Sequence, residues 1–149
     1  MQGIYRVAAI LKGLYSLQVS NIIERDGNCM FRAMSFHLFG KQTRHLTVRT
    51  NAIAWLKANM DILHAFAAQG DGHFSADQYL DRMAKPGEWG DEIMLMAITQ
   101  AYQVSIMVNS GYDDATGDFI ATVYPHDASG PHCGLMFLAN SQHYEIVFP

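Results

Sequence analysis

The segment that decides the fold runs from residue 25 to residue 40 and reads Arg25-Asp26-Gly27-Asn28-Cys29-Met30-Phe31-Arg32-Ala33-Met34-Ser35-Phe36-His37-Leu38-Phe39-Gly40. Its first four residues form a cluster of turn formers. The apolar residues that follow are compatible with a helix, and Gly40 is a typical C-terminal stop. The pattern therefore predicts that Cys29 lies where a loop turns into a helix.

Cys29 is a candidate nucleophile at this position. A cysteine near a helix N-terminus forms a thiolate more readily, and the thiolate is the reactive species. Asp26, Gly27 and Asn28 favour a loop that aims successive backbone N–H groups at one point, as a developing oxyanion requires. The alternative is that Cys29 is a small buried apolar side chain, which is the usual state of a free cysteine.

A histidine base for such a nucleophile is present near the C-terminus, in the sequence His143-Tyr144-Glu145. Residues 143–148 alternate in polarity, which predicts a strand. Because successive side chains of a strand point to opposite faces, His143 and Glu145 share one face. A carboxylate beside a histidine can orient the imidazole. The alternative is a half-solvated strand whose polar face meets water.

The remaining segments predict helices first and strands afterwards. Apolar residues spaced three and four apart predict helices over 4–15, 46–68, 76–83 and 91–102. Ser75 is expected to cap the helix over 76–83. A period of two predicts strands over 104–108, 118–124 and 135–138, and a short strand is expected at 19–23. This order indicates an α+β fold, and the length of 149 residues indicates that 1–149 is a single domain.

Charge and cysteine content exclude several classes of protein. Only 16% of residues are charged and 50% are hydrophobic, which excludes a disordered chain. The ten Lys and Arg residues are scattered, so we expect no nucleic-acid partner. Lys12 interrupts the N-terminal apolar run, and the uncharged stretch 93–112 contains polar residues, so neither a signal peptide nor a membrane segment is expected. Two cysteines allow at most one disulfide, which favours a reducing compartment.

The two motifs together resemble the ovarian-tumour (OTU) family of cysteine proteases. In that family Asp-Gly-x-Cys, an apolar-aromatic pair and Arg-Ala or similar frame the nucleophile, as residues 26–33 do here. A His-aromatic-Asn/Asp sequence near the C-terminus supplies the base and its orienting residue, and residues 143–145 are its match. Trp89-Gly90 and the apolar run to Tyr102 resemble the family's Trp-Gly element and the central helix after it.

The resemblance implies a papain-like OTU fold of the α+β class, with a small, mostly antiparallel β-sheet packed between helices. It also implies a deubiquitinase, a thiol protease that hydrolyses isopeptide or peptide bonds after the C-terminal glycine of ubiquitin or a ubiquitin-like modifier. Cys29 is then the nucleophile and His143 the general base, and Asp26 with the backbone of Gly27, Asn28 and Cys29 shapes the oxyanion hole. The expected partners are ubiquitin conjugates, and no metal or organic cofactor is required. We expect a cytoplasmic monomer, or one in a host cytosol if the protein is a viral or bacterial effector.

Glu145 departs from the Asn or Asp of the family, because its side chain is longer by one methylene. We expect its carboxylate to orient His143, with Asn140 or an upstream residue as the alternatives. The departure leaves a second hypothesis of another class, a catalytically silent module that binds ubiquitin. A third hypothesis is thiol-dependent hydrolysis of some other amide.

Two further groups of residues are weaker candidates. His126, His132 and Cys133 share one segment, but no paired spacing completes the four ligands of a structural zinc site. Cys133 also lacks the turn-to-helix context of a nucleophile. Three acids between two predicted strands are ordinary turn residues, or else complement the cationic tail of ubiquitin, namely Asp113, Asp114 and Asp118.

Overall fold

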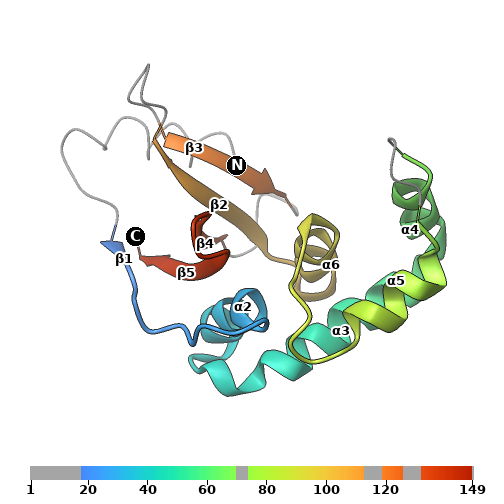
Figure 1. The fold of residues 1–149 in the computed structure, drawn as a ribbon, viewed down its shortest axis with the longest axis horizontal. Helices are drawn as coiled ribbons and strands as arrows, with labels where there is room; N and C mark the ends of the chain where they lie inside the picture. The colour runs from blue at the N-terminus through green and yellow to red at the C-terminus, as the bar shows by residue number, and fades with distance from the viewer. Residues whose placement is uncertain (1–17, 70–73, 113–118, 126–131, 149) are drawn as a thin grey trace.

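The computed structural model describes residues 18–69, 74–112, 119–125 and 132–148 (Figure 1). Its helices are α2 (Cys29–Phe39), a short 3-10 helix η1 (Gln42–Arg44), α3 (His45–Ala58), α4 (Met60–Ala67), α5 (Ala76–Met83) and α6 (Glu92–Tyr102). Its strands are β1 (Gln18–Val19), β2 (Ser105–Tyr112), β3 (Phe119–Tyr124), β4 (His132–Leu138) and β5 (His143–Phe148). The helix expected over 4–15 lies outside the described residues.

The five strands form one sheet in the order β1-β5-β4-β2-β3. All neighbouring strands are antiparallel except β2 and β4, which run parallel. The parallel pair arises because β3 returns along one side of β2 and β4 is then added on the other side. The predicted α+β class with a mostly antiparallel sheet is confirmed. The strand that begins with His143 is held by β1 on one side and β4 on the other.

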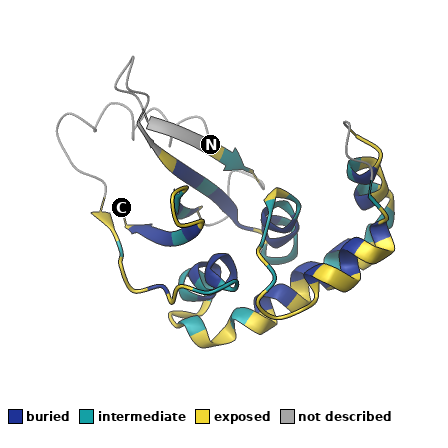
Figure 2. Ribbon diagram, viewed as in Figure 1, coloured by how far each residue is buried: buried dark blue, intermediate teal, exposed yellow. Residues whose placement is uncertain are grey.

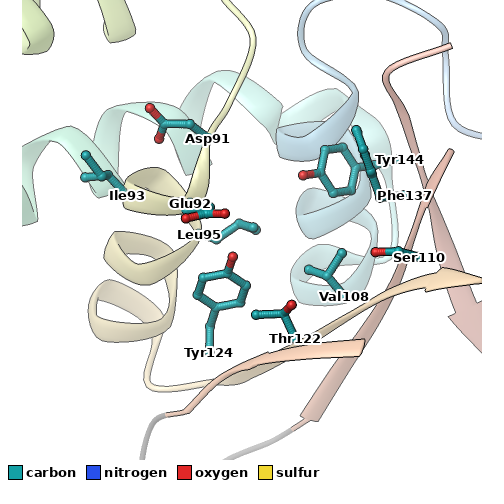
Figure 3. Close-up of a pocket in the computed structure, with 10 residues that line it drawn as sticks. All are labelled: Asp91, Glu92, Ile93, Leu95, Val108, Ser110, Thr122, Tyr124, Phe137 and Tyr144. Carbon is teal, nitrogen blue, oxygen red and sulfur yellow. The ribbon is translucent and has the colours of Figure 1, made fainter. Parts of the chain in front are cut away.

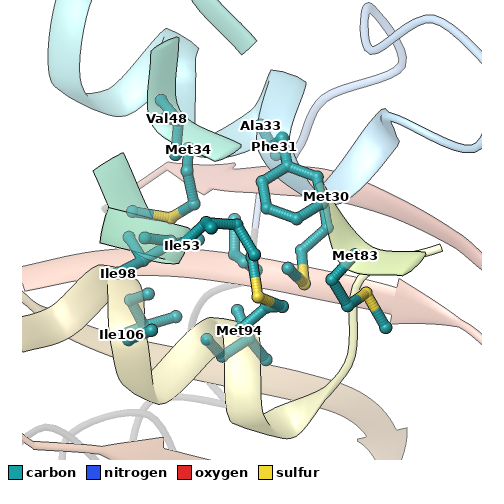
Figure 4. Packing of buried hydrophobic residues seen from close by; sticks show 14 of the residues in the cluster. Met30, Phe31, Ala33, Met34, Val48, Ile53, Met83, Met94, Ile98 and Ile106 are labelled. Atoms are coloured by element: carbon teal, nitrogen blue, oxygen red, sulfur yellow. The ribbon is translucent and has the colours of Figure 1, made fainter. Parts of the chain in front are cut away.

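The hydrophobic core lies between α3 and the helices α2 and α6, and between these two helices and the sheet (Figures 2 and 4). Met30, Phe31 and Met34 of α2 pack there with Ile98 of α6 and Ile106 of β2 (Figure 4). Full burial of such a side chain stabilises a fold by about 1.5–3 kcal/mol. Because Cys29 is the first residue of α2, this packing also fixes the position of the thiol.

The single helix predicted over 46–68 is wrong, because the chain breaks at Asn59 into α3 and α4. Asn59 adopts φ −132° and ψ 49°. Its side-chain amide donates to the carbonyl of Trp55 at 2.9 Å, and its backbone N–H donates to Leu56 at 3.0 Å. The side chain has therefore taken the acceptor that a continuing helix needs, which is how asparagine competes with helical hydrogen bonding.

The strand expected at 19–23 is also shorter, since β1 ends at Val19. The backbone N–H of Ser20 still donates to Ile146 at 2.9 Å, but that of Ile23 donates to the Glu145 carboxylate at 3.1 Å. The chain thus leaves the sheet and crosses the end of β5. This segment forms one wall of the site described below.

Two predicted helix ends, at Gly40 and Ser75, are confirmed, and the structure adds a third cap at Asp91. Gly40 ends α2 in the left-handed conformation, with φ 74°. Ser75 caps α5 by accepting from the N–H of Gln78, and Asp91 caps α6 by accepting from the N–H of Met94 at 2.9 Å. Within the described residues, no helix is both long enough and apolar enough to cross a bilayer.

Candidate active site

The loop before α2 is built around the carboxylate of Asp26. Asp26 accepts hydrogen bonds from the backbone N–H of Asn28 at 2.9 Å and from Nε of Arg32 at 3.1 Å. A further bond from the Arg32 guanidinium, at 2.9 Å, completes an ion pair. Burial alone raises the pKa of Asp26, but the hydrogen bonds from Arg32 and Asn28 outweigh it and leave the pKa lowered. Asp26 therefore stays ionised and holds the loop closed over the first turn of α2.

A buried arginine ties this loop to the segment that precedes α6. Oδ1 of Asn28 accepts from the backbone N–H of Gly87 at 2.7 Å and from Arg49 at 3.0 Å. The Arg49 side chain, only 1% exposed, also donates to the carbonyls of Met83 and Glu88, each at 2.8 Å. Its guanidinium lies 4.0 Å from the centre of the Phe31 ring. A single cation thus fixes the distance between the nucleophile loop and the loop carrying Trp89-Gly90.

Cys29 is almost completely buried at the N-terminus of α2, with 1% of its surface exposed. Its Sγ lies 3.9 Å from the carbonyl oxygen of Gln142, the residue before His143. Burial raises the pKa of the Cys29 thiol, although hydrogen bonds from the backbone of Tyr144 and Met30 oppose the shift. In this conformation desolvation therefore outweighs the helix N-terminus, and Cys29 rests as a neutral thiol.

His143 and Glu145 form a buried pair beside the thiol. Nε2 of His143 hydrogen-bonds to Oε2 of Glu145, and the side chains are only 2% and 3% exposed. An ionised carboxylate only accepts hydrogen bonds, so Nε2 carries the proton and Nδ1 is left with its lone pair. Nδ1 is buried and has no hydrogen-bond partner among the described residues. The imidazole is thus in the tautomer that can take a proton from Cys29.

This burial contradicts the alternative of a solvent-facing strand. The polar face of β5 is covered by the segment that leaves β1 and by α2. Oε1 of Glu145 accepts from Ser20 Oγ at 2.6 Å and from the N–H of Ile23 at 3.1 Å. Both carboxylate oxygens therefore have partners, and the extra methylene of Glu145 is accommodated.

A family comparison agrees with this geometry. The family described as "OTU-like cysteine protease" matches residues 24–144, most of the chain. The chain belongs to the OTU-like cysteine protease family. The predicted family resemblance is therefore confirmed.

Several relatives and solved structures share the OTU domain. OTU domain-containing protein 4 of Mus musculus is 28% identical over 137 residues, 92% of this chain but 11% of that protein. OVARIAN TUMOR DOMAIN-containing deubiquitinating enzyme 10 of Arabidopsis thaliana is 37% identical over 89 residues, 60% of this chain and 24% of that enzyme. The chain therefore spans only a minor part of these relatives.

Solved structures share the fold of this OTU domain. The OTU domain of OTUD1 superposes with a TM-score of 0.75 at 23% identity, and the alignment covers 100% of both chains. An OTU domain in complex with ubiquitin superposes with a TM-score of 0.63 at 21% identity, over 88% of this chain and 69% of that one. The predicted OTU fold is confirmed.

A cleft of about 510 Å³ opens next to the site, between α6 and the sheet (Figure 3). Tyr144 follows His143 on β5, and by strand alternation its side chain lies on the other face, where it lines this cleft. In Figure 3 its hydroxyl points across the cleft toward α6. Asp91 and Glu92 line the opposite side at the start of α6. The OTU domain therefore has an open cleft with an acidic rim, lined by the residue next to His143.

The weaker candidates remain apart from the site. Asn140 is exposed in the turn before β5, whereas the carboxylate on His143 is that of Glu145. Cys133 is buried in β4, and burial raises the pKa of its thiol to about 11. No cluster of metal-binding side chains occurs in the part of the OTU domain that the structure describes. His132 is exposed at the start of β4, and the other candidates lie outside the described part, namely Asp113, Asp114, Asp118 and His126.

Two residues of the site were not found by sequence reasoning. Arg49 lies in the middle of a helix, where an arginine is ordinarily a solvated surface residue. Ser20 lies within the strand expected at 19–23, in a stretch without any catalytic motif. A charged residue on the apolar stripe of α3, beside Val48 and Ala52, is the one available signal for Arg49. No comparable signal marks Ser20.

Replacing Glu145 with alanine is expected to lower the turnover number more than tenfold. The imidazole loses its hydrogen-bond acceptor and the charge that stabilises its protonated form. Steady-state hydrolysis of a fluorogenic ubiquitin C-terminal amide provides the measurement. Glu88→Ala is the matched control, because the Glu88 carboxylate pairs with Arg82 near the surface and its loss leaves turnover within twofold. An unchanged turnover number for Glu145→Ala would show that Glu145 does not orient His143 for catalysis.

Proposed function

We propose that this OTU domain is a deubiquitinase that hydrolyses isopeptide or peptide bonds after the C-terminal glycine of ubiquitin or a ubiquitin-like modifier. The observation that carries the proposal is the buried His143–Glu145 pair beside Cys29, with the proton on Nε2 and Nδ1 unpaired within the described residues. A purely structural histidine needs neither a buried carboxylate partner nor a ring nitrogen without a hydrogen bond. Family membership and the deubiquitinating relatives support the same chemistry.

The reaction begins with proton transfer from Cys29 Sγ to Nδ1 of His143. The thiolate attacks the carbonyl carbon of the terminal glycine, and the carbonyl π electrons move to oxygen. Collapse of this oxyanion expels the lysine amine, which takes the proton from the imidazolium and leaves a thioester on Cys29. Water attacks the thioester while His143 accepts its proton. The modifier then leaves as a carboxylate, and Cys29 is protonated again.

Loop amides are proposed to stabilise the oxyanion in both steps. The candidates remain the backbone groups of Asp26, Gly27, Asn28 and Cys29. The N–H of Asn28 donates to the Asp26 carboxylate, that of Cys29 to the Asp26 carbonyl at 3.2 Å and that of Asp26 to the Glu24 carbonyl at 3.2 Å. In this proposal these donors exchange partners when the oxyanion forms. Asp26 therefore acts by shaping the loop. Glu145 stabilises the imidazolium that exists between the proton transfers.

The cleft beside Tyr144 is proposed to receive the C-terminal segment of the modifier. It lies beside the catalytic pair in sequence, because Tyr144, which lines it, directly follows His143. Asp91 and Glu92 on its rim favour a cationic segment. In this proposal Asp91 and Glu92 complement the cationic tail of ubiquitin. The sequence had offered that role to the acids between residues 113 and 118. We further propose that the domain acts as a monomer in a reducing, cytoplasmic compartment, where the thiol survives, and that it does not bind nucleic acid.

A ubiquitin-binding module without turnover is the second candidate. It is favoured by the neutral, 1% exposed thiol, which makes no hydrogen bond to His143 in this conformation. Catalytic hydrogen bonds are often long in a free enzyme and form when the substrate binds. The enzyme hypothesis therefore requires substrate to draw Cys29 and His143 together.

A ubiquitin derivative with a C-terminal alkyne or vinyl electrophile separates the hypotheses. We expect the intact mass to increase by one ubiquitin, and peptide mapping to locate the modification on Cys29. Binding of ubiquitin by titration calorimetry without any adduct would instead identify the silent module. If ubiquitin neither binds nor reacts, but iodoacetamide shows that Cys29 is reactive, hydrolysis of another amide is the hypothesis that remains.

A further inference from the structure

Ser20 makes a direct hydrogen bond to the carboxylate that orients the base. Its Oγ donates to Oε1 of Glu145 at 2.6 Å and accepts from the backbone N–H of Ile146 at 3.2 Å. The accepted bond leaves the hydroxyl proton directed at the carboxylate. The backbone N–H of Ser20 also donates to Ile146 at 2.9 Å, so the residue is anchored in the ladder beside β5.

Glu145 accepts hydrogen bonds from Ser20 and Ile23. These contacts lie outside the part of the chain that the family comparison covers. The family match runs over residues 24–144, whereas Ser20, Ile23 and Glu145 all fall beyond its limits. Two donors from the segment after β1 therefore meet a carboxylate of β5, and none of the three is part of the matched region.

We propose that Ser20 is a positioning residue that makes Glu145 competent to orient His143. The glutamate side chain has one more rotatable bond than aspartate, so its carboxylate has more orientations to choose from. Ser20 and the N–H of Ile23 together hold Oε1, which directs Oε2 to Nε2 of His143. Hydrogen bonds to an ionised group are the strong class, so loss of one of two donors loosens the carboxylate. The proposal rests on the proposed function only for its kinetic consequence.

The kinetic test is a double-mutant cycle between Ser20 and Glu145. Ser20→Ala is expected to lower the turnover number about fivefold to tenfold, the effect of one ordinary hydrogen bond, because the N–H of Ile23 still holds Oε1, with KM within twofold. Ser20→Thr keeps the hydroxyl and is expected to restore turnover to within twofold of the parent. In the Glu145→Ala background, Ser20→Ala is expected to cause no further loss. Equal losses in both backgrounds would overturn the proposal.

Ser35→Ala is the matched control for the loss of a serine hydroxyl. Ser35 Oγ also donates one bond and accepts one, from the N–H of Arg44 at 3.1 Å, but it makes neither bond to the catalytic side chains. Ser35→Ala is expected to lower thermal stability. Any effect of Ser35→Ala on the turnover number is expected to be equal in the parent and in the Glu145→Ala background. Coupling of Ser35 to Glu145 as strong as that of Ser20 would show that the cycle reports general loosening, and would overturn the proposal.

A spectroscopic measurement tests the same contact without turnover. The proton on Nε2 of His143, buried against a carboxylate, is expected to give a downfield proton NMR signal that Glu145→Ala abolishes. Ser20→Ala is expected to broaden or shift this signal, whereas Ser20→Thr and Ser35→Ala preserve it. An unaltered signal in Ser20→Ala would overturn the positioning role even in an active enzyme. The NMR signal can depend on Ser20 as expected while the wild-type protein fails to react with the ubiquitin electrophile. That result would refute the proposed function and leave the positioning role of Ser20 intact.

Discussion

Replacing Cys29 with alanine is expected to abolish hydrolysis of ubiquitin conjugates, a loss of at least about 10⁴-fold in turnover number. Alanine cannot form the thioester, and no other described cysteine can substitute. Cys133, the second cysteine, lies in β4 with a pKa raised by burial to about 11. The remaining side chains of the site stay in place, because the substitution removes a single sulfur atom. Affinity for a ubiquitin conjugate, measured by calorimetry, is therefore expected to stay within about threefold of the parent.

Cys133→Ala is the matched control for this loss. Cys133 is also a buried free thiol, so its replacement creates a similar small cavity and costs about 1 kcal/mol of stability. Turnover and electrophile labelling are expected to stay within twofold of the parent. Residual turnover in Cys29→Ala that disappears when Cys133 is also replaced would contradict the assignment of the nucleophile.

Replacing Gly27 with alanine is expected to lower the turnover number by about 100-fold or more. A Cβ at Gly27 would lie 1.6 Å from the backbone carbonyl oxygen of Gly87, so the two loops have to separate. Separation strains the 2.7 Å hydrogen bond between Asn28 Oδ1 and the N–H of Gly87. The loop amides then move relative to the thiol, and a displacement of about 1 Å at a reacting centre costs on this order. Hydrolysis of the fluorogenic substrate and a thermal unfolding scan provide the measurements.

Gly40→Ala separates this effect from the general cost of replacing a glycine. Gly40 has a left-handed φ of 74°, but a Cβ there meets nothing within 4 Å. Its replacement is expected to cost about 1–2 kcal/mol of stability, through backbone strain at the end of α2, with turnover within twofold of the parent. Turnover of Gly27→Ala near that of Gly40→Ala would show that the contact between the two loops does not position the oxyanion hole.

The resting site explains why a buried thiol is compatible with a protease. Cys29 is neutral because burial raises the pKa of its thiol, and its Sγ faces the carbonyl of Gln142 instead of His143. A neutral thiol is a poor nucleophile and resists oxidation. Under the proposed function, activation requires a shift that brings Sγ of Cys29 and Nδ1 of His143 into contact when substrate binds.

Local sequence signals predicted the elements that carry Cys29 and His143. The turn formers 25–28 and the αL glycine at 40 bracket α2, because loop and helix-end conformations depend on single residues. The alternation after residue 142 placed His143 and Glu145 on one face, because a strand has a period of two. The same local reasoning failed at Asn59, where one side-chain amide took a helical acceptor that apolar periodicity does not report.

By itself, then, the sequence determined the class of fold, the family, and the pairing of Cys29 with His143 as candidates. Only the tertiary structure decided that the face bearing Glu145 is buried, and that Ser20 and Ile23 hold its carboxylate. It also revealed Arg49 as the cation that joins two loops. These contacts join residues 21 to 125 positions apart, so no local pattern encodes them. The physical reason is that burial and hydrogen-bond partners depend on which segments meet after folding.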